Sequence, residues 1–388
     1  GDLLAEGQGF VSANIHSSVS GTVVKIDQVI DTSGFRKPCV VINVEGDEWA
    51  GGIDTSADLV GDISHSAGEI RKKVQEAGIV GLGGGTFPSH VKLSVPEGKQ
   101  VDTLVINGVE CEPYLTCDHR VMLERAEEVI VGIKLLMKAQ GVERAMIGIE
   151  SNKADAIDKL NQVVDGEDGI EVYGLKVKYP QGGEKQLIKA LLNREVPSGG
   201  LPLDVGVVVQ NVGTALAVYE AVQKNKPLVE RVVTVTGKSV KHPTNLMVRI
   251  GTPVGDLLEA AGGMPEDTGK IVSGGPMMGK ALKSTDTPVV KGTCGILVMT
   301  EKEARRESER HCIRCSKCVS VCPMALEPYL LKTLAKMERN DELEENRVLD
   351  CMECGSCSYT CPSRIPLLDY IRYGKSNVNQ IIRNRKQN

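Results

Sequence analysis

The sequence contains no apolar run approaching twenty residues, so we expect no transmembrane helix in it. It also has no excess of basic residues: the formal net charge is −5, which argues against a nucleic-acid partner. No secretory signal peptide is recognisable, so we expect reduced cysteines in a cytoplasmic protein rather than disulfides. The sequence opens on Gly1 without a methionine, and we therefore expect that an N-terminal segment is missing from it.

Eight of the twelve cysteines form two runs of one pattern near the C-terminus. The spacing is C-x2-C-x2-C-x3-C-P, which in bacterial ferredoxins binds a [4Fe–4S] cluster through three cysteines and sends the fourth to the neighbouring cluster. This spacing predicts two clusters with crossed ligands. The first takes Cys312, Cys315, Cys318 and Cys361, and the second takes Cys351, Cys354, Cys357 and Cys322.

Structural zinc sites and disulfides are the alternatives for these cysteines. Zinc normally takes its thiolates in pairs rather than four within eleven residues. Disulfides would need an oxidising compartment. The remaining cysteines are scattered and are expected to be reduced thiols: Cys39, Cys111, Cys117 and Cys294. The duplicated run therefore predicts a protein that transfers electrons one at a time through its C-terminal quarter.

At 388 residues the chain is too long for one core and should divide into several units. Strands alternate with helices from about residue 66 to 224, which predicts a mostly parallel sheet covered on both faces. The expected order is a barrel-sandwich (lipoyl-like) β module over 1–55, an α/β domain over 60–228, a β-grasp module over 229–270, a linker over 271–300, a helical two-cluster domain over 301–375 and a basic tail over 376–388. The tail is either a solvated end or a contact with an acidic partner or membrane face.

A glycine-rich segment over residues 78–88, followed by Lys92, is the second chemical signal. Glycine clusters let backbone N–H groups close on a phosphate because no Cβ obstructs them. Lys92 could add a charge-assisted contact. The segment does not match the Rossmann G-x-G-x-x-G fingerprint, since no strand runs straight into it. By itself it could be a turn.

Three polar clusters strengthen the case for a ligand. They lie at predicted strand ends or helix starts: Asn107 to Glu112, Gly182 to Lys185, and Gln210 to Thr214. Such places suit anionic and hydrogen-bonding ligands. Each amide or carboxylate taken singly could be a helix cap or turn residue. Taken together they favour a ligand cleft, in which Asn107 and Asn211 could read a flavin ring and its ribityl chain.

These motifs, in this order, resemble the RnfC family, the C subunits of Rnf ion-translocating oxidoreductase complexes, whose flavoprotein part is similar to the NADH-binding subunit of respiratory complex I. The likeness runs over essentially the whole chain. It is carried by residues 10–24, 81–92, 105–114, 178–187, 210–214 and 273–279 and by both cysteine runs. A long set of motifs in one order is more specific than any single motif.

The resemblance implies a multidomain α/β protein with a Rossmann-like FMN domain, a β-grasp (SLBB-like) module and a dicluster ferredoxin domain. It implies noncovalent FMN and NAD(H) in addition to the clusters. The implied FMN residues are Gly81, Gly83, Gly84, Lys92, Asn107, Gln210, Asn211 and Thr214, and NAD(H) would be lined by Phe87, Glu112, Glu184 and Lys185. Gly85, Glu110 and Gly183 complete the implied cofactor site.

The chain departs from the complex I relative at several positions of this site. It has Leu82, Gly85 and Thr86 in the glycine loop, and Val109 where the relative has an aspartate. Val196 stands where the relative has an aromatic residue that sandwiches adenine. These departures affect the nicotinamide pocket more than the FMN site.

The resemblance implies a peripheral subunit on the cytoplasmic face of the inner membrane, in an Rnf-type complex with other subunits, one of them ferredoxin-like. Such a complex is a ferredoxin:NAD⁺ oxidoreductase that couples electron transfer to Na⁺ or H⁺ translocation. NADH gives up a hydride whereas an iron–sulfur cluster accepts one electron, so FMN belongs between them. Two alternatives share the motifs: a soluble cobalamin reductase of bacterial microcompartments, and an electron-transfer subunit without flavin.

Overall fold

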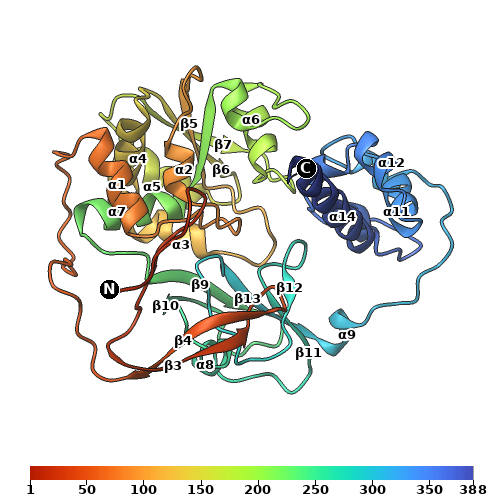
Figure 1. Ribbon diagram of the computed structural model, residues 1–388, viewed down its shortest axis with the longest axis horizontal. Coiled ribbons are helices and arrows are strands. Elements are labelled where there is room, and N and C mark those ends of the chain that lie inside the picture. Colours follow the sequence, from red (N-terminus) through yellow and green to blue (C-terminus); the bar gives the residue numbers. More distant parts are fainter. Residues whose placement is uncertain (388) are drawn as a thin grey trace. The chain divides into compact units, whose positions relative to one another are not determined.

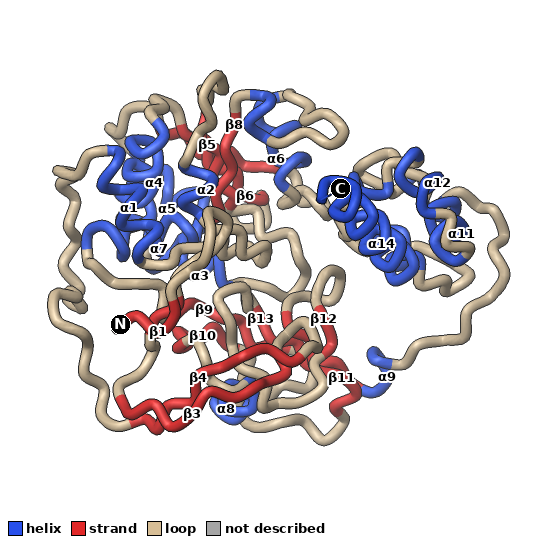
Figure 2. The backbone as a smooth tube through the Cα atoms, in the orientation of Figure 1, coloured by secondary structure: helices blue, strands red, loops and turns tan. Residues whose placement is uncertain are grey.

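The computed structural model describes residues 1–387 and divides the chain into two compact units. The first unit comprises residues 1–195 and 202–304, and the second comprises residues 196–201 and 305–388. Figure 2 shows sheets within the first unit, whereas the described part of the second unit consists of helices and loops.

A four-stranded parallel sheet forms the centre of the α/β domain in the first unit. Its strands are β5 (Thr103–Asn107), β6 (Ala145–Glu150), β7 (Ile170–Leu175) and β8 (Val207–Asn211), in the order β7-β6-β5-β8. Leu104, Ile106 and Ile147 are fully buried, as expected for strands that are covered on both faces. The strand order reverses between β5 and β8, as in doubly wound folds.

Helices cover both faces of this sheet. They are α1 (Ala67–Glu76), α2 (Ser89–Leu93), α3 (Cys117–Glu124), α4 (Ala126–Gln140), α5 (Ala154–Val164), α6 (Glu184–Leu192) and α7 (Val212–Gln223), with the 3₁₀ turn η1 (Pro202–Val205) before β8. Figure 1 shows α1, α4, α5 and α7 together on one side of the sheet and α6 on the other. The sequence pattern predicted one helix over residues 118–140, but Arg125 leaves the helical conformation, with φ −128°, and separates α3 from α4.

The β-grasp region forms a five-stranded sheet in the order β10-β9-β13-β11-β12. The strands are β9 (Glu230–Thr236), β10 (Thr244–Arg249), β11 (Thr268–Ser273), β12 (Lys280–Ala281) and β13 (Gly295–Thr300), and the sheet shares an apolar core with α8 (Val254–Ala260). This arrangement corrects the prediction of a linker over 271–300, in which only one strand, near residues 296–299, was expected. Because β13 pairs in parallel with β9, Ile296 and Val298 lie in the core, and the long loop before β13 hid this non-local pairing from a local pattern.

The N-terminal region contributes two small antiparallel sheets to the first unit. β1 (Leu3–Ala5) pairs with β2 (Ile15–His16), and β3 (Gly21–Ile30) pairs with β4 (Arg36–Val44). The turn at residues 19–21, which has no lysine that could carry a lipoyl group, leads directly into β3.

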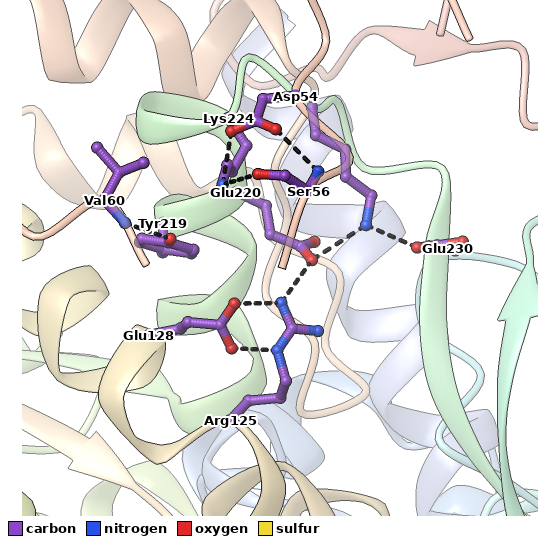
Figure 3. Close-up of polar contacts among 10 residues, drawn as sticks. Asp54, Ser56, Val60, Arg125, Glu128, Tyr219, Glu220, Lys224 and Glu230 are labelled. Carbon is purple, nitrogen blue, oxygen red and sulfur yellow. Dashed lines mark hydrogen bonds and ion pairs between the residues drawn. The ribbon is translucent and has the colours of Figure 1, made fainter. Parts of the chain in front are cut away.

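Partly buried ion pairs join the parts of the first unit (Figure 3). Glu220 of α7 accepts from Arg125 at 3.2 Å and from Lys226 at 3.0 Å, and Lys226 also pairs with Glu230 of β9 at 2.6 Å. Lys224, at the end of α7, pairs with Asp54 of the N-terminal segment. Residues of three predicted modules therefore stabilise one compact unit.

The second unit is built from short helices around the cysteine runs, and α9 (Glu301–Ala304) precedes it. Its elements are α10 (Lys317–Ser320), α11 (Pro328–Lys336), α12 (Asn340–Glu345), the 3₁₀ turn η2 (Val348–Asp350), α13 (Ser356–Tyr359) and α14 (Leu367–Gln387). α14 packs on α11 and α12, and its Val378 is 1% exposed. Residues 376–387 of the predicted basic tail are thus the end of a packed helix, and residue 388 lies outside the described residues.

Candidate cofactor sites

Two asparagines meet where the strand order of the parallel sheet reverses. Asn107 ends β5 and Asn211 ends β8, and the two residues are register partners in neighbouring parallel strands. Ligands of open α/β sheets bind outside the carboxyl ends of the strands at such a reversal, because the loops there diverge and leave a crevice. The two amides therefore lie where this fold is best suited to hold a cofactor.

The glycine-rich loop is fixed to the start of α7. It closes on itself through the Gly81 N–H, which donates to the Phe87 carbonyl at 2.9 Å. The Leu82 N–H donates to Oγ1 of the buried Thr214, in the first turn of α7, at 2.9 Å. A helix N-terminus attracts anions because its first N–H groups are unpaired and its dipole is positive there. The loop and this helix start can therefore share one anionic ligand.

The glycines of this loop leave its outer side free. Gly84 has φ +94°, and a Cβ added to Gly84 or Gly85 would meet no atom within 4 Å. A Cβ on Gly83 would lie 3.5 Å from the side chain of Asn211. The backbone is thus open to a ligand at Gly84 and Gly85 and close to the strand end at Gly83.

Both asparagines are already held by protein groups. Oδ1 of Asn211 accepts the Gly213 N–H at 2.9 Å and so caps α7, while its Nδ2 donates to Asp118 at 2.6 Å. Nδ2 of Asn107 donates to the Gly182 carbonyl at 2.8 Å. Asn211 is thus a helix cap and Asn107 a loop residue, which are the structural roles that each amide alone suggested.

Gln210 differs from the two asparagines because its amide is buried without a complete set of partners. The residue is 2% exposed, and its Nε2 has no hydrogen-bond partner among the described residues. A buried unpaired donor costs on the order of 1–3 kcal/mol, so it is a place where a ligand acceptor would fit. Gln210 lies one residue before the strand end, beside Ile106 of β5.

Lys92 joins the end of α2 to β8 and α6. Its Nζ donates to Glu184 at 2.8 Å and to the Val209 carbonyl at 3.0 Å. Gly183 is the N-cap of α6, so Glu184 and Lys185 occupy its first turn. Nζ of Lys92 is therefore bound to protein acceptors and does not extend freely toward the glycine loop. The Glu184 carboxylate partly neutralises its positive charge.

Glu110 and Asp118 form a half-buried carboxylate pair, with oxygens within 4.8 Å of each other. Glu110 accepts the backbone N–H groups of Asp118 at 2.8 Å and of His119 at 3.2 Å, at the start of α3. Burial and the neighbouring Asp118 carboxylate raise the pKa of Glu110 to about 7. Sequence reasoning missed Asp118, whose only signal was a place at the start of a predicted helix, yet it contacts Asn211 directly.

The residues implied for NAD(H) come from separate elements of the first unit. Glu112 accepts the backbone N–H groups of Met277 and Met278, at 2.6 and 2.8 Å, in the loop between β11 and β12. Phe87 is 42% exposed at the end of the glycine loop. The described contacts thus give Glu112 a loop-positioning role and leave the Phe87 ring accessible to a ligand.

The two cysteine runs are folded alike, 39 residues apart. Arg314 and Glu353 occupy equivalent positions and both have left-handed backbone, with φ 54° and 61°. Ser316 and Gly355 do the same, with φ 58° and 77°. Turns of this kind direct successive backbone N–H groups into a concavity, which is common at iron–sulfur sites. The repeat predicted from the cysteines therefore extends to the backbone.

A cavity in the second unit is lined by four cysteines, from both runs. They are Cys322, Cys351, Cys354 and Cys357. This is the crossed set that the spacing predicted for the second cluster. Around it lie apolar side chains that include Leu326, Leu331 and Ile371. The donor set and the dry lining fit a [4Fe–4S] cluster.

The first run is more open. Cys312 and Cys315 are exposed and Cys318 is half-buried. Burial and, to a smaller degree, the nearby Cys361 raise the pKa of the Cys318 thiol, so Cys361 of the second run lies near the first run. The described thiols form no disulfide.

Four family models match successive parts of the chain. They are the RnfC barrel sandwich hybrid domain over residues 1–47, the Nuo51 FMN-binding domain over 74–220, the SLBB domain over 232–281 and the 4Fe-4S dicluster domain over 304–362. This order confirms the predicted fold class. The FMN-binding match spans the glycine loop and the reversal of the sheet.

Whole-chain relatives carry the same order. The C subunit of the proton-translocating ferredoxin:NAD(+) oxidoreductase complex of Clostridium ljungdahlii is 48% identical over 97% of this chain and 82% of that protein. The C subunit of the Na(+)-translocating complex of Acetobacterium woodii is 46% identical over 100% of this chain and 87% of that protein. The chain belongs to the RnfC family. These relatives confirm the resemblance to this family that the sequence motifs indicated.

Membership of the RnfC family gives the cofactors. The FMN-binding and 4Fe-4S dicluster domains make FMN and two [4Fe–4S] clusters the resident groups of this family member. The unpaired Gln210 amide, the open glycine loop and the four-cysteine cavity fit these groups. The NAD⁺-reducing [NiFe]-hydrogenase, in its H₂-reduced state, shares the fold with a TM-score of 0.55 and 19% identity over 81% of this chain and 63% of that chain.

No helix in the described part of this family member is both long and apolar enough to cross a membrane. α14, its longest helix, is 21 residues long and has several charged side chains.

Proposed function

We propose that this chain is the FMN- and NADH-binding electron-transfer subunit of an ion-translocating ferredoxin:NAD⁺ oxidoreductase complex. The observation that carries the proposal is the presence, in one chain, of two asparagines at the reversal of a parallel sheet and of a cavity lined by four cysteines from both runs. The relatives at 48% and 46% identity are named as C subunits of such complexes. They support this reading over the cobalamin reductase and the flavin-free alternatives.

FMN would lie at the carboxyl ends of β5 and β8. The glycine loop would hold its phosphate through backbone N–H groups, near the positive end of the α7 dipole. The unpaired Gln210 amide would donate to an acceptor on the flavin, and Asn107 and Asn211 would fix the loops that surround it. Gly81 to Gly85, Gly183 and Thr214 would shape this site.

NAD(H) would stack against the flavin from the open side of the glycine loop. Phe87, Glu184 and Lys185 would line the nucleotide, whereas Glu112 would act by holding the 277–278 loop. The bound flavin accepts a hydride and releases electrons singly, which allows a two-electron donor to serve one-electron acceptors. Nζ of Lys92 forms an ion pair with Oε1 of Glu184 at 2.8 Å. Their opposite charges partly cancel, so neither residue presents a full charge to the ligand.

The eight run cysteines would ligate the clusters in the crossed sets given by their spacing. The remaining subunits would supply the ion path, and one of them, a ferredoxin-like subunit, would be the electron partner. We place the chain on the cytoplasmic face of the membrane, where NADH and ferredoxin are found. This location follows from the proposed reaction.

An anaerobic titration of the purified chain with NADH tests the proposal. We expect the flavin absorbance near 450 nm to bleach and EPR signals of reduced iron–sulfur clusters to follow. Gly84→Glu should remove FMN, because a carboxylate would occupy the phosphate position, while leaving the iron content unchanged. Gly51→Glu is the matched control, since a Cβ there also meets no atom within 4 Å. Normal FMN content in Gly84→Glu would place the phosphate elsewhere.

A further inference from the structure

The first cysteine run lies on an exposed surface of the second unit. Residues 305–317 are all exposed, and Ile313, between the first two cysteines, is 68% exposed. The corresponding cysteines of the second run are less exposed: Cys351 is half-buried and Cys354 is 8% exposed. An exposed large aliphatic side chain beside redox ligands is a feature that a partner surface can bury.

Basic side chains without ion-pair partners surround Ile313. The acidic residues of this segment are paired: Glu307 with Arg364 at 3.3 Å, and Glu309 with Lys332 at 3.8 Å. Arg306 pairs with Asp369 at 3.1 Å. Within the described residues, Arg310, Arg314 and Lys317 form no ion pair. These three cations with Ile313 are the first-run surface.

The same position in the second run carries the opposite charge. Glu353 is equivalent to Arg314, and it pairs with Arg372 at 2.9 Å and Lys375 at 3.2 Å. The Gly199 N–H lies 3.3 Å from Asp350, which directly precedes Cys351, so the segment 196–201 covers that end of the second run. The first run therefore carries an unpaired positive charge at a position where the second run carries a paired negative one.

The C-terminal end, which sequence reasoning offered as a docking element, has less free charge. Arg372 and Lys375 are used by Glu353, and Arg385 pairs with Asp341 at 3.1 Å and with Glu344 at 2.8 Å. Its Val378 is packed in the core. A truncation at residue 376 would remove part of that core and would not test docking.

We propose that Arg310, Ile313, Arg314 and Lys317 form the docking surface for an acidic iron–sulfur subunit of the same complex. This inference rests on the proposed function. Complementary charge would orient the partner and raise its association rate, and Ile313 would provide an apolar anchor. A single electron passes between the partner's centre and the first-run centre, so that one is oxidised as the other is reduced, with no proton or bond transferred.

Charge reversal in the assembled complex tests the surface. We expect Arg310→Glu/Arg314→Glu/Lys317→Glu to lower ferredoxin-dependent NAD⁺ reduction at least tenfold and to weaken its dependence on salt. NADH-to-dye reduction should stay unchanged. The control, Lys336→Glu/Arg347→Glu/Arg383→Glu, makes the same charge change at exposed residues outside the first run that have no ion pair among the described residues. It should match wild type in both reactions.

A photo-crosslinking amino acid at position 313 gives a readout that does not depend on activity. We expect mass spectrometry of the cross-linked complex to identify an acidic iron–sulfur subunit. Cross-links only to lipid, to a membrane-spanning subunit, to soluble ferredoxin or to residues 60–228 of this chain would overturn the proposal, as would equal effects of the two triple variants. Loss of NADH-to-dye reduction in wild type would instead contradict the proposed function.

Discussion

Cys312 and Cys315 of the first run are exposed, whereas Cys354 and Cys357 of the second run are each 8% exposed and line an apolar cavity. Both runs have the same spacing, and both have left-handed backbone at equivalent positions. The shared features specify how a cluster is ligated. The flanking residues specify its surroundings, so duplication of one motif has produced a protected site and an accessible one.

Replacing one cysteine ligand in each run should give the largest difference between the two runs, in the folding of the second unit. Cys357 belongs to the apolar core of the second unit with Leu331 and Ile371, so Cys357→Ser should abolish the cooperative unfolding of that unit, because cluster binding supplies folding free energy there. Cys312→Ser should keep about four irons per chain and a cooperative transition. Iron analysis and circular dichroism melts measure both, with Cys39→Ser as control. Equal damage by the two variants would contradict the comparison.

The crossed ligands give the next largest effect, which is the loss of one cluster. Cys361 is predicted to serve the first-run cluster although it lies in the second run. Cys361→Ser should therefore leave the protected cluster, whose iron is released slowly to a chelator. If the remaining iron left at the fast rate of the accessible cluster, the ligands would not cross. The measurement is the time course of chelation in wild type and variant.

Two half-buried glutamates, Glu353 and Glu110, extend the comparison to pH. Arg372 and Lys375 hold the pKa of Glu353 below its usual value against the effect of burial, so its stabilisation is complete above about pH 4.5 and is lost in acid. Burial and Asp118 raise the pKa of Glu110 to about 7, so the native state retains its proton and the free energy of unfolding falls between about pH 4.5 and 7.

Glu110→Gln should remove this decrease in the free energy of unfolding with rising pH. Denaturant unfolding of the holoprotein at pH 5.5 and 8 should show a loss on the order of 1–2 kcal/mol in wild type beyond any loss in the variant. Glu353→Gln is the control, and its difference from wild type should be the same at both pH values. A parallel response of Glu110→Gln and wild type would show that Glu110 is ionised throughout.

The smallest effect concerns the reduction potential of the accessible cluster. Arg314 and its neighbouring cations favour the reduced, more negative cluster, so Arg314→Glu should lower its potential by about 10–40 mV, given that an exposed charge is worth on the order of 0.2–1 kcal/mol. Lys336→Glu should change it less. An EPR-monitored redox titration resolves the two clusters. A shift confined to the protected cluster would reverse their assignment.

Much of this architecture could be predicted because it rests on local signals. Cysteine spacing gave the crossed set that lines the cavity, and the alternation of strands and helices gave a parallel sheet. Contacts between residues far apart in the sequence could not be predicted from local patterns. The pairing of β13 with β9 joins residues about sixty positions apart, and the contact of Asp118 with Asn211 joins α3 to α7.

The sequence also could not show which polar side chains are already bound to other protein groups. Residue type indicated that Asn107, Asn211 and Lys92 could bind a ligand, but each is held by protein groups. The same amide or ammonium group can bond the protein backbone or a cofactor. Similarly, five basic residues near the C-terminus suggested a charged tail, and most of them pair within the second unit. Composition alone cannot distinguish paired charge from free charge.

One chain is proposed to hold both a flavin and two iron–sulfur clusters. The most direct test of this proposal is the cofactor content of anaerobically purified protein, by metal analysis, sulfide assay and flavin fluorescence after acid release. We expect about eight irons, about eight acid-labile sulfides and about one FMN per chain, without zinc. Zinc in place of iron, or full iron content with no flavin bound even after FMN is supplied, would contradict it.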